Sequence, residues 1–430
     1  MARIEKAPGF DYSFVLSILD NEELREKLIR AAYSVKGYPP WRYVKYHPVK
    51  DINPKHLWQA LLFTRGLKPL STLKAVDGKP FKVSFPAILM KLVHDADMML
   101  GFSLQTTQPF RGIDKDMQRT YIQRSLAEEA ISSSQMEGAA TTRAVAREMI
   151  FTSREPKDLS ERMILNNYRT MGMLKEWKDR EMSLDLLKDI HRQMTEDVLP
   201  PEKCGRFRTA ADAIDVWDGI KVLHDPPPAG QLERRLQAVV DFANSDDDET
   251  SYLHPIIKAS ILHFMIGYEH PFRDGNGRTA RSLFYWYLLR KGYWLMEFLS
   301  ISALLKQPDW NRRYAEAYLD VEYAGLDLTY FALMQTENLL AAAREFHAYV
   351  DERQKGLSKL RTVLNSVYNN RQIDLVDHMS RHPGYAYTVA EHARWHGVTP
   401  NTARADLDGL EKGGLLVSIM RGKVRTYFKA

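Results

Sequence analysis

Two strongly apolar helical segments separated by a short glycine-rich loop constrain the fold of this chain more than any other feature. The first, at about 255–268, is apolar on most of its sides, which predicts a helix buried at the centre of a domain. The second apolar helix is expected at about 279–289. Most of the remaining pattern is also helical, so the sequence predicts a mainly α-helical fold.

The length of 430 residues suggests two or three domains and is ample for a sizeable core. We place the boundaries at 1–112, an N-terminal helical extension without recognisable chemistry, and 113–350, a central domain. A charged linker is expected at 351–370, followed by a small domain at 371–430.

Composition narrows the cellular setting. The 60 basic and 55 acidic residues leave a formal charge of +5, too weak a bias to demand a nucleic-acid partner. A single cysteine, Cys204, excludes an internal disulfide framework and a Cys-rich zinc site. The chain lacks a run of the ~18 apolar residues that a membrane span needs, and its start, MARIEKAPGFDYSF, lacks the apolar core of a secretory signal. We therefore expect a soluble cytoplasmic protein without a membrane partner.

The loop between the apolar helices, HPFRDGNGRTAR at 270–281, carries the clearest chemistry; we call it the motif loop. Gly275 and Gly277 allow a tight turn and a close approach of a ligand to backbone N–H groups. The N-terminus of the following helix favours an anion, and Arg278 and Arg281 share one helix face from which both can hold it. Asn276 adds an amide donor.

Two further side chains complete the predicted site. Asp274 offers the hard oxygen ligand that Mg²⁺ prefers, and His270, at the end of the preceding helix, is a candidate general base. The alternative is an ordinary turn with no function, since turns are commonly rich in Gly and Asp. The combination of His, Asp, Asn and two Arg at compatible spacing instead favours a site that holds a magnesium–polyphosphate and deprotonates a nucleophile.

The motif loop matches throughout the signature of the Fic family, H-x-F-x-[DE]-G-N-G-R-x-x-R, and the chain resembles that family over about 113–350. Members transfer AMP from ATP onto protein hydroxyls, usually of Tyr, Thr or Ser, and a few transfer other phosphate-linked groups. The resemblance implies that His270 activates the target hydroxyl and Asp274 binds magnesium. It implies contacts of Arg278 with the β-phosphate and Arg281 with the γ-phosphate. The implied ATP-binding set is Phe272 (the loop's apolar anchor), Gly275, Asn276, Gly277, Arg278 and Arg281.

A second motif, Ser133-x-x-x-Glu137-Gly138, resembles the inhibitory helix [ST]-x-x-x-E-[GN] of many Fic proteins. Taken alone this pattern is typical of a solvated helix face. Beside a complete motif loop it implies that Glu137 pairs with Arg281 in the place of the γ-phosphate and that Ser133 shares the site. In some relatives the same glutamate positions water to remove AMP, so the reverse activity stays open.

Two β-prone runs flank Asp218-Gly219, which predicts a hairpin. Such a hairpin often only caps a core. In position and character it also resembles the Fic flap that borders the active site and holds a target segment by strand pairing. The candidate flap residues are Ile220, Lys221, Val222 and Leu223.

The last sixty residues resemble a winged helix-turn-helix. If this module binds DNA, its second helix presents Asn401, Thr402 and Arg404 to the major groove. The wing residues that would meet phosphates are Arg421, Lys423 and Arg425. The alternative of a protein-interaction or purely structural module is equally supported, since Asp406 and Asp408 lie on the same helix.

We thus expect a mainly α protein with a Fic helical core, a small β-hairpin flap and a C-terminal winged helix domain. The expected function is that of an autoinhibited protein adenylyltransferase using ATP and Mg²⁺, with a target protein, self-modification, DNA and a homodimer as candidate partners. The alternatives are a DNA-binding regulator whose Fic domain senses nucleotide, and an enzyme that removes AMP or transfers another phosphate-linked group.

Overall fold

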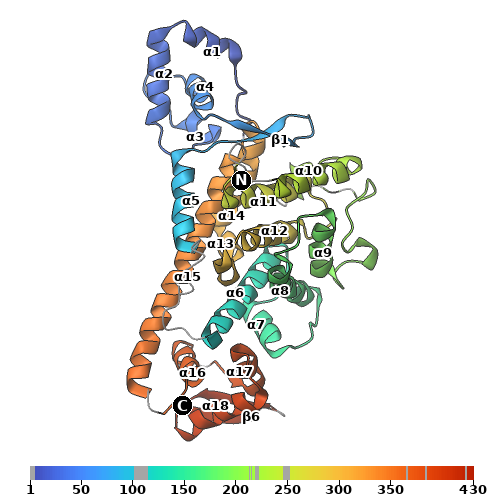
Figure 1. The fold of residues 1–430 in the computed structure, drawn as a ribbon, viewed down its shortest axis with the longest axis vertical. Helices are drawn as coiled ribbons and strands as arrows, with labels where there is room; N and C mark the ends of the chain where they lie inside the picture. The colour runs from blue at the N-terminus through green and yellow to red at the C-terminus, as the bar shows by residue number, and fades with distance from the viewer. Residues whose placement is uncertain are drawn as a thin grey trace.

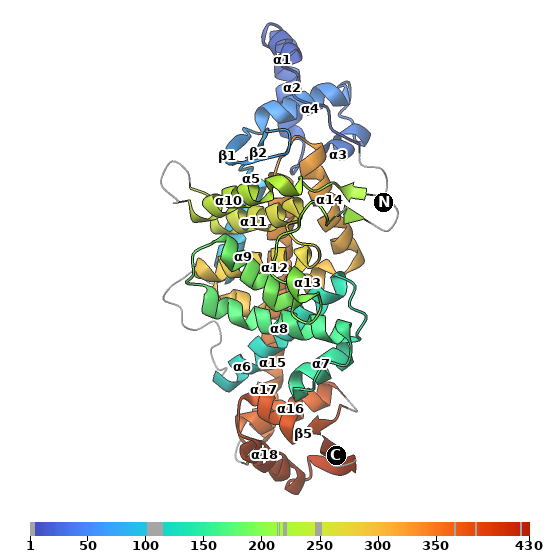
Figure 2. The same ribbon diagram turned by 90° about the vertical axis from the view of Figure 1, so that its right-hand side faces the viewer.

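The computed structural model describes residues 5–430 apart from 101–114, 213, 215, 218–221, 246–251, 365–366, 383–384 and 422–423. Helices dominate, as predicted, and the strands in the described residues form small antiparallel sheets. Figures 1 and 2 show an elongated molecule with the N-terminal helices at one end and the C-terminal domain at the other.

The N-terminal region folds as short helices, as predicted, together with a hairpin that the sequence patterns did not indicate. Strands β1 and β2 pair antiparallel with Lys68 opposite Val83. Buried Trp41 and Trp58 lie 5.8 Å apart between ring centroids and form part of the core here. The elements are α1 (Tyr12–Leu19), α2 (Glu22–Ser34), α3 (Trp41–Tyr46), α4 (Pro54–Thr64), β1 (Lys68–Lys74), β2 (Pro80–Val83) and α5 (Ala87–Leu100).

The central body is a layered bundle of helices with a short hairpin at its surface. Its first half comprises α6 (Lys115–Met136), α7 (Arg143–Thr152), α8 (Leu159–Trp177), α9 (Leu184–Thr195), β3 (Val216–Trp217) and β4 (Val222–His224), with a short 3₁₀ turn at Pro201–Lys203. Its second half comprises α10 (Leu232–Asn244), α11 (Pro255–Glu269), α12 (Asn276–Arg290), α13 (Ile301–Leu305) and α14 (Pro308–Tyr323), with 3₁₀ turns at Ala229–Gln231 and Trp294–Phe298.

Helices α11 and α12 are the predicted central pair. Almost every residue of both is buried, which confirms the prediction that the first of them is a buried central helix. Helix α12 begins at Asn276, three residues earlier than predicted. Gly275 adopts the left-handed conformation (φ 78°) and caps the helix, and the Thr279 hydroxyl donates to the Gly275 carbonyl at 2.9 Å. The glycine–asparagine–glycine segment is therefore the first helical turn, not an open loop.

One long helix, α15 (Thr329–Leu364), runs along the molecule and packs against α5, α11 and α14 (Figure 1). At ~1.5 Å per residue its 36 residues measure about 54 Å. It continues without interruption through residues 351–364, most of the segment 351–370 where a linker was expected.

The C-terminal residues form a separate small core. Three helices, α16 (Asn370–Arg381), α17 (Val389–His396) and α18 (Pro400–Lys412), pack against a sheet of β5 (Tyr387–Thr388), β6 (Leu416–Arg421) and β7 (Val424–Lys429). The sheet order is β5-β7-β6. Thr399 caps α18 through its side chain and Pro400 occupies the first turn, as predicted. This domain contacts α6 and α7 of the central body through α17.

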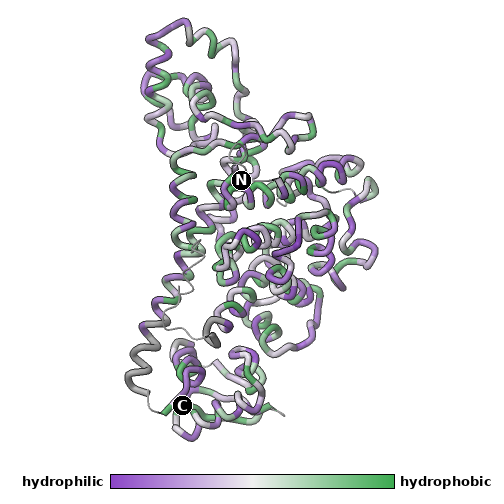
Figure 3. The backbone as a smooth tube through the Cα atoms, in the orientation of Figure 1, coloured by the Kyte–Doolittle hydropathy of each residue, from purple (hydrophilic) through white to green (hydrophobic). Residues whose placement is uncertain are grey.

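In Figure 3, hydrophobic and hydrophilic residues alternate along the helices. Within the described residues, no helix combines the length and the apolar character that crossing a membrane requires.

Candidate active site

The backbone reverses direction at His270, where α11 ends. This residue has φ 46° and ψ 57°, a left-handed conformation that costs energy for any residue with a side chain. Arg208 holds the reversal, because its Nε donates to the His270 carbonyl at 2.8 Å and its backbone N–H donates to the Pro271 carbonyl at 2.9 Å. Sequence reasoning assigned no role to Arg208, since its partners lie some sixty residues away.

The imidazole of His270 has a defined proton position. Its Nδ1 lies 3.3 Å from the Gly267 carbonyl, which can only accept, so Nδ1 carries the hydrogen and Nε2 keeps its lone pair. Burial lowers the pKa of His270 to about 4, against smaller opposing effects of the Gly267 carbonyl and the Glu137 carboxylate. At neutral pH the ring is therefore uncharged and can accept a proton at Nε2.

Phe272 anchors the motif loop by stacking on His191 of α9. The ring centroids lie 3.7 Å apart with an interplanar angle of 3°, and Phe272 is fully buried. His191 Nδ1 accepts from the Gly205 N–H at 2.9 Å, so its Nε2 carries the hydrogen and donates to the Asp274 carbonyl at 2.9 Å. His191 thus joins the loop to α9, a contact that no spacing pattern in the sequence revealed.

This neutral histidine makes stability depend on pH. Burial lowers the pKa of His191 to about 4, below the ~6.5 of an unfolded chain. Between these values the unfolded state binds more protons, so folding stability falls as pH drops from about 6.5 towards 4. In the variant His191→Gln the side-chain amide still offers a hydrogen-bond donor, but it has no group that titrates in this pH range. We expect its melting temperature to be lower at pH 7 and to fall less than that of the unmodified protein between pH 7 and pH 5. Melting temperatures that fall equally with pH in the two proteins, measured by calorimetry, would contradict this assignment.

The Asn276 side chain differs from its expected role as a phosphate donor. Its Oδ1 accepts from the Phe272 N–H and its Nδ2 donates to the Phe272 carbonyl, both at 2.8 Å. Both ends of the amide therefore close the motif loop on itself. What remains for an anion at this position is the backbone N–H, which in the first turn of α12 has no intrahelical acceptor.

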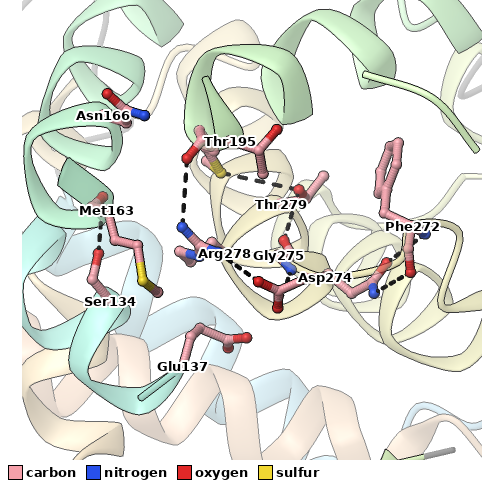
Figure 4. Close-up of polar contacts among 12 residues, drawn as sticks. Ser134, Glu137, Met163, Asn166, Thr195, Phe272, Asp274, Gly275, Arg278 and Thr279 are labelled. Atoms are coloured by element: carbon pink, nitrogen blue, oxygen red, sulfur yellow. Dashed lines mark hydrogen bonds and ion pairs between the residues drawn. The ribbon is translucent and has the colours of Figure 1, made fainter. Parts of the chain in front are cut away.

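Arg278 is a buried cation with unused donors. It is 0% exposed, its Nη1 lies 3.5 Å from the Met194 carbonyl, and its Nη2 lies 3.6 Å from Asp274 Oδ2 (Figure 4). Within the described residues its Nε and Nη2 have no hydrogen-bond acceptor. Burial lowers the pKa of Arg278 below its ordinary value. A buried guanidinium in this state is costly unless an anion joins it.

Arg281, in contrast, is engaged by the second motif through both Nε and Nη2. Its Nε donates to Ser133 Oγ at 2.9 Å and its Nη2 donates to the Ser133 carbonyl at 3.1 Å. The same Nη2 forms an ion pair with Glu137 Oε1 at 2.9 Å. Burial alone would raise the pKa of Glu137, but Arg281 and Arg278 outweigh it and hold that pKa below its ordinary value.

Glu137 and Gly138 lie in the turn that follows α6, and Gly138 has a positive φ of 96°. The carboxylate lies directly over the start of α12, because a Cβ at Gly277 would come within 2.1 Å of Glu137 Oε1. The side chain is 21% exposed and faces the motif loop (Figure 4). An anionic group therefore already occupies the helix N-terminus.

Helix α6 is held against the central pair by a carboxylate that sequence reasoning missed. Glu129 is buried and accepts from the Tyr285 hydroxyl at 3.0 Å, from Ser300 Oγ at 3.0 Å and from the Ser302 N–H at 2.9 Å. Its donors come from α12 and from the start of α13. Helix α6, which carries Ser133, is therefore fixed to α12 and α13 at a point about two turns before Glu137.

The carboxylate of Asp274 in the motif loop is accessible to solvent, with 48% of its side chain exposed. Its Oδ1 accepts from the Gly275 N–H at 2.7 Å. The described residues contain no group of three or more His, Cys, Asp or Glu side chains that would hold a metal by themselves. The donor set nevertheless fits Mg²⁺, which in nucleotide sites is usually bound by one or two carboxylates together with substrate phosphates.

The predicted hairpin is present as β3 and β4, with Val216 opposite His224 and Trp217 opposite Val222. Ile220 and Lys221 lie outside the described residues, and for Val222 and Leu223 only the backbone of β4 is described. His224 joins the end of β4 to the body.

The contacts of His224 place the hairpin beside α11. Its Nε2 donates to the Tyr268 carbonyl at 2.7 Å and its Nδ1 lies 3.0 Å from Glu322 Oε2. Burial would lower the pKa of His224, but the contact with Glu322 outweighs it and raises the value. The end of β4 is therefore attached to the helix that ends at His270.

The predicted DNA-contacting residues are only partly available. Asn401 and Arg404 are exposed on α18, while Thr402 is half-buried and its hydroxyl lies 2.9 Å from that of Thr399. Arg425 is engaged with acidic residues, Asp408 at 3.2 Å and Glu411 at 2.6 Å. The Arg421 side chain and all of Lys423 lie outside the described part of the chain.

Comparisons with known proteins find sequence similarity within the central body. Residues 181–288 match the family model described as "Fic/DOC family". Protein adenylyltransferase Fic of Nematostella vectensis is 38% identical over 116 residues, 27% of this chain and 25% of that protein. Protein adenylyltransferase fic-1 of Caenorhabditis elegans is 33% identical over 113 residues, 26% of this chain and 20% of that protein. The chain thus spans about a quarter of the length of the curated relatives it matches.

A solved structure extends the likeness to most of the fold. The crystal structure of a Fic family protein from Desulfovibrio desulfuricans G20 superposes with a TM-score of 0.51 at 16% sequence identity. The match covers 81% of this chain and 97% of that one. At this identity the likeness concerns the fold alone.

Proposed function

We propose that this chain, which contains a Fic domain, transfers AMP from ATP to a Tyr, Thr or Ser hydroxyl of a target protein and is held inactive by Glu137. The observation that carries the proposal is the pair of buried arginines at the start of α12. Arg278 has unused donors, and Arg281 is neutralised by a carboxylate from the protein itself. This is the arrangement expected of a polyphosphate site with an internal anion in it.

The phosphates of ATP would lie over the N-terminus of α12. The first-turn N–H groups point outward there, and the helix dipole favours negative charge. Gly277 has no side chain, so a phosphate can approach the backbone closely. Arg278 would contact the β-phosphate and Arg281 the γ-phosphate. Asp274 would hold Mg²⁺, which supplies charge neutralisation on the phosphate oxygens.

The proposed reaction needs one proton acceptor. The target hydroxyl gives its proton to Nε2 of His270, and its oxygen forms a bond to the α-phosphorus of ATP. The bond from that phosphorus to the bridging oxygen of the β-phosphate breaks, and pyrophosphate leaves. Negative charge grows on that oxygen, close to Arg278. The neutral ring of His270 supports this role, since a protonated ring could not accept.

Autoinhibition is supported by the position of Glu137. Its carboxylate pairs with the guanidinium that the γ-phosphate would otherwise use, and like charges at one site repel. With Arg281 occupied, ATP would bind with its phosphates misaligned for in-line attack. The fixation of α6 through Glu129 implies that relief needs only a movement of the turn 137–138, with the helix left in place.

The direct test is mass spectrometry of the purified protein and of a cell lysate after incubation with ATP and Mg²⁺. We expect a mass increase of one AMP on hydroxyl side chains of a target or of the protein itself. Loss of AMP from a previously modified target, without any gain elsewhere, would indicate the reverse activity. Unlabelled protein in every fraction, including with the Glu137→Gly variant, would refute the proposal.

For the C-terminal domain we propose duplex DNA binding as a second function. The supporting observation is that Asp406 faces inward, paired with Arg371 at 2.7 Å, which leaves Asn401 and Arg404 as the exposed polar residues at the start of α18. The order of helices and strands is also that expected of a winged helix. Arg425, paired with acidic neighbours, would have to exchange partners to contact phosphate.

DNA binding would show a characteristic dependence on salt. In a gel-shift assay of the full chain we expect affinity to fall steeply as salt rises, because counterions are released from phosphates. Arg404→Ala should reduce discrimination between sequences, whereas Arg425→Ala should flatten the salt slope by one unit at most. Absence of a shift at low salt would favour a protein-interaction role. Light scattering on the same sample tests the expected homodimer.

A further inference from the structure

A cavity of about 420 Å³ lies where the C-terminal domain meets the helix that leads to Glu137. Its walls come from α6, α7, α13 and the segment before it, α15, α16 with the residues that follow it, and α17. No residue of the motif loop lines it. Its volume falls within the range of small-molecule sites, which is roughly 300–1,000 Å³.

The walls are largely aromatic. Trp395 of α17 stacks on Phe151 of α7, with ring centroids 5.7 Å apart, and the central body adds the rings of Phe298, Phe346 and Tyr349. Aromatic walls of this kind accept a flat apolar ligand, because ring pairs gain from offset or edge contacts beyond simple burial. The composition of the cavity lining therefore favours a planar ring system.

Two hydrogen-bond donors at the cavity lack acceptors. Arg124 of α6 lies over the Trp395 ring at 3.9 Å and donates through Nη1 to the Tyr349 hydroxyl at 3.0 Å. Its Nε is buried without an acceptor in the described residues, as is the indole Nε1 of Trp395. Each unmet buried donor costs free energy, and Arg124 keeps hydrogen-bonding capacity beyond its contact with Tyr349.

The charges around the cavity favour an anion. Among the described residues, Arg124 has no carboxylate within ion-pairing distance. The acidic side chains of the lining are Glu128, which is paired with Arg143 at 3.1 Å and Arg147 at 2.6 Å, and Glu345, which is exposed. Arg124 thus remains the cation without a counter-charge, and carboxylates are the natural planar partners of guanidinium groups.

We propose that this cavity binds a small aromatic carboxylate, with its ring against the aromatic lining and its carboxylate on the guanidinium of Arg124. Such a ligand would bridge the C-terminal domain and α6. If its affinity differs between the inhibited and released states, it would also shift the position of Glu137. That consequence alone rests on the proposed function, whereas binding itself does not.

The experiment titrates the full chain with 2-naphthoate in a calorimeter, in the absence of ATP. We expect saturable one-site binding with a Kd of about a millimolar or below, the affinity that ordinary ligand efficiency gives a molecule of this size. Arg124→Gln should weaken it at least about tenfold, a fold-change in keeping with the loss of a charged hydrogen bond. The neutral 2-naphthamide should bind more weakly. Arg119→Gln, on the same helix but exposed and outside the lining, should bind like the unmodified protein.

A second variant guards against a folding defect in Arg124→Gln. Ser125 lies in the lining on α6, so Ser125→Phe fills the cavity and leaves Arg124 in place. We expect loss of 2-naphthoate binding with an unchanged circular dichroism spectrum and melting temperature. Binding that is absent in the unmodified protein, or that survives both Arg124→Gln and Ser125→Phe, would overturn the proposal.

Discussion

Replacement of His270 is expected to reduce AMP transfer by about 10²–10⁴-fold, the usual contribution of a general base. The variants are His270→Ala and His270→Asn in a Glu137→Gly background, where the transfer rate is high enough to measure. His270→Asn is the better-matched change, because asparagine tolerates the left-handed conformation found at this position. ATP binding should be largely retained in both variants, since the imidazole is not a phosphate ligand.

Two measurements check this result. Transfer of labelled AMP gives the rate, and calorimetry with ATP gives the affinity. The neutral ring also predicts a rate that is flat across neutral pH and falls only as pH approaches about 4, where Nε2 becomes protonated. If either variant labelled as fast as its Glu137→Gly parent, His270 would not be the base.

The second large effect is expected from Glu137→Gly, which should raise AMP transfer, including self-modification, by roughly 10–100-fold. This estimate follows from the return of one charge-assisted contact, about 1.5–3 kcal/mol, between Arg281 and the γ-phosphate. Glu137→Gln removes the charge but keeps the size of the side chain, and it should give an intermediate rate. Arg281→Ala should not restore activity, because it removes the phosphate contact together with the inhibitory pair.

Autoradiography of the purified variants at equal protein concentration provides the comparison. Melting temperatures measured alongside show whether any difference arises from folding. Equal self-modification by the unmodified protein and by Glu137→Gly would refute autoinhibition, even where transfer itself is found.

The sequence was sufficient to predict the parts of this structure that depend on local pattern. The buried pair α11 and α12, the hairpin around 216–224 and the cap at Thr399 all follow from periodicity and turn chemistry. The side chains that secure the motif loop escaped because their partners are distant along the chain. His191 bonds to the Asp274 carbonyl across 83 positions, and Glu129 accepts from Tyr285 across 156.

Asn276 shows a different limit of sequence reasoning. An amide in an anion-binding motif is reasonably interpreted as a phosphate donor, yet its two ends satisfy the backbone of Phe272. Which role wins depends on loop geometry, because a buried backbone N–H without a partner costs as much as a lost ligand contact.

The uninterrupted helix α15 has a mechanical consequence for the whole molecule. A single helix of about 54 Å resists bending. It therefore holds the N-terminal helices and the C-terminal domain at a fixed separation (Figure 2). A hinge motion that brings the two ends together over the motif loop would require this helix to bend. A macromolecule that contacts both ends at once must therefore be long enough to reach along the side of the central body, and a small one can engage only one end at a time.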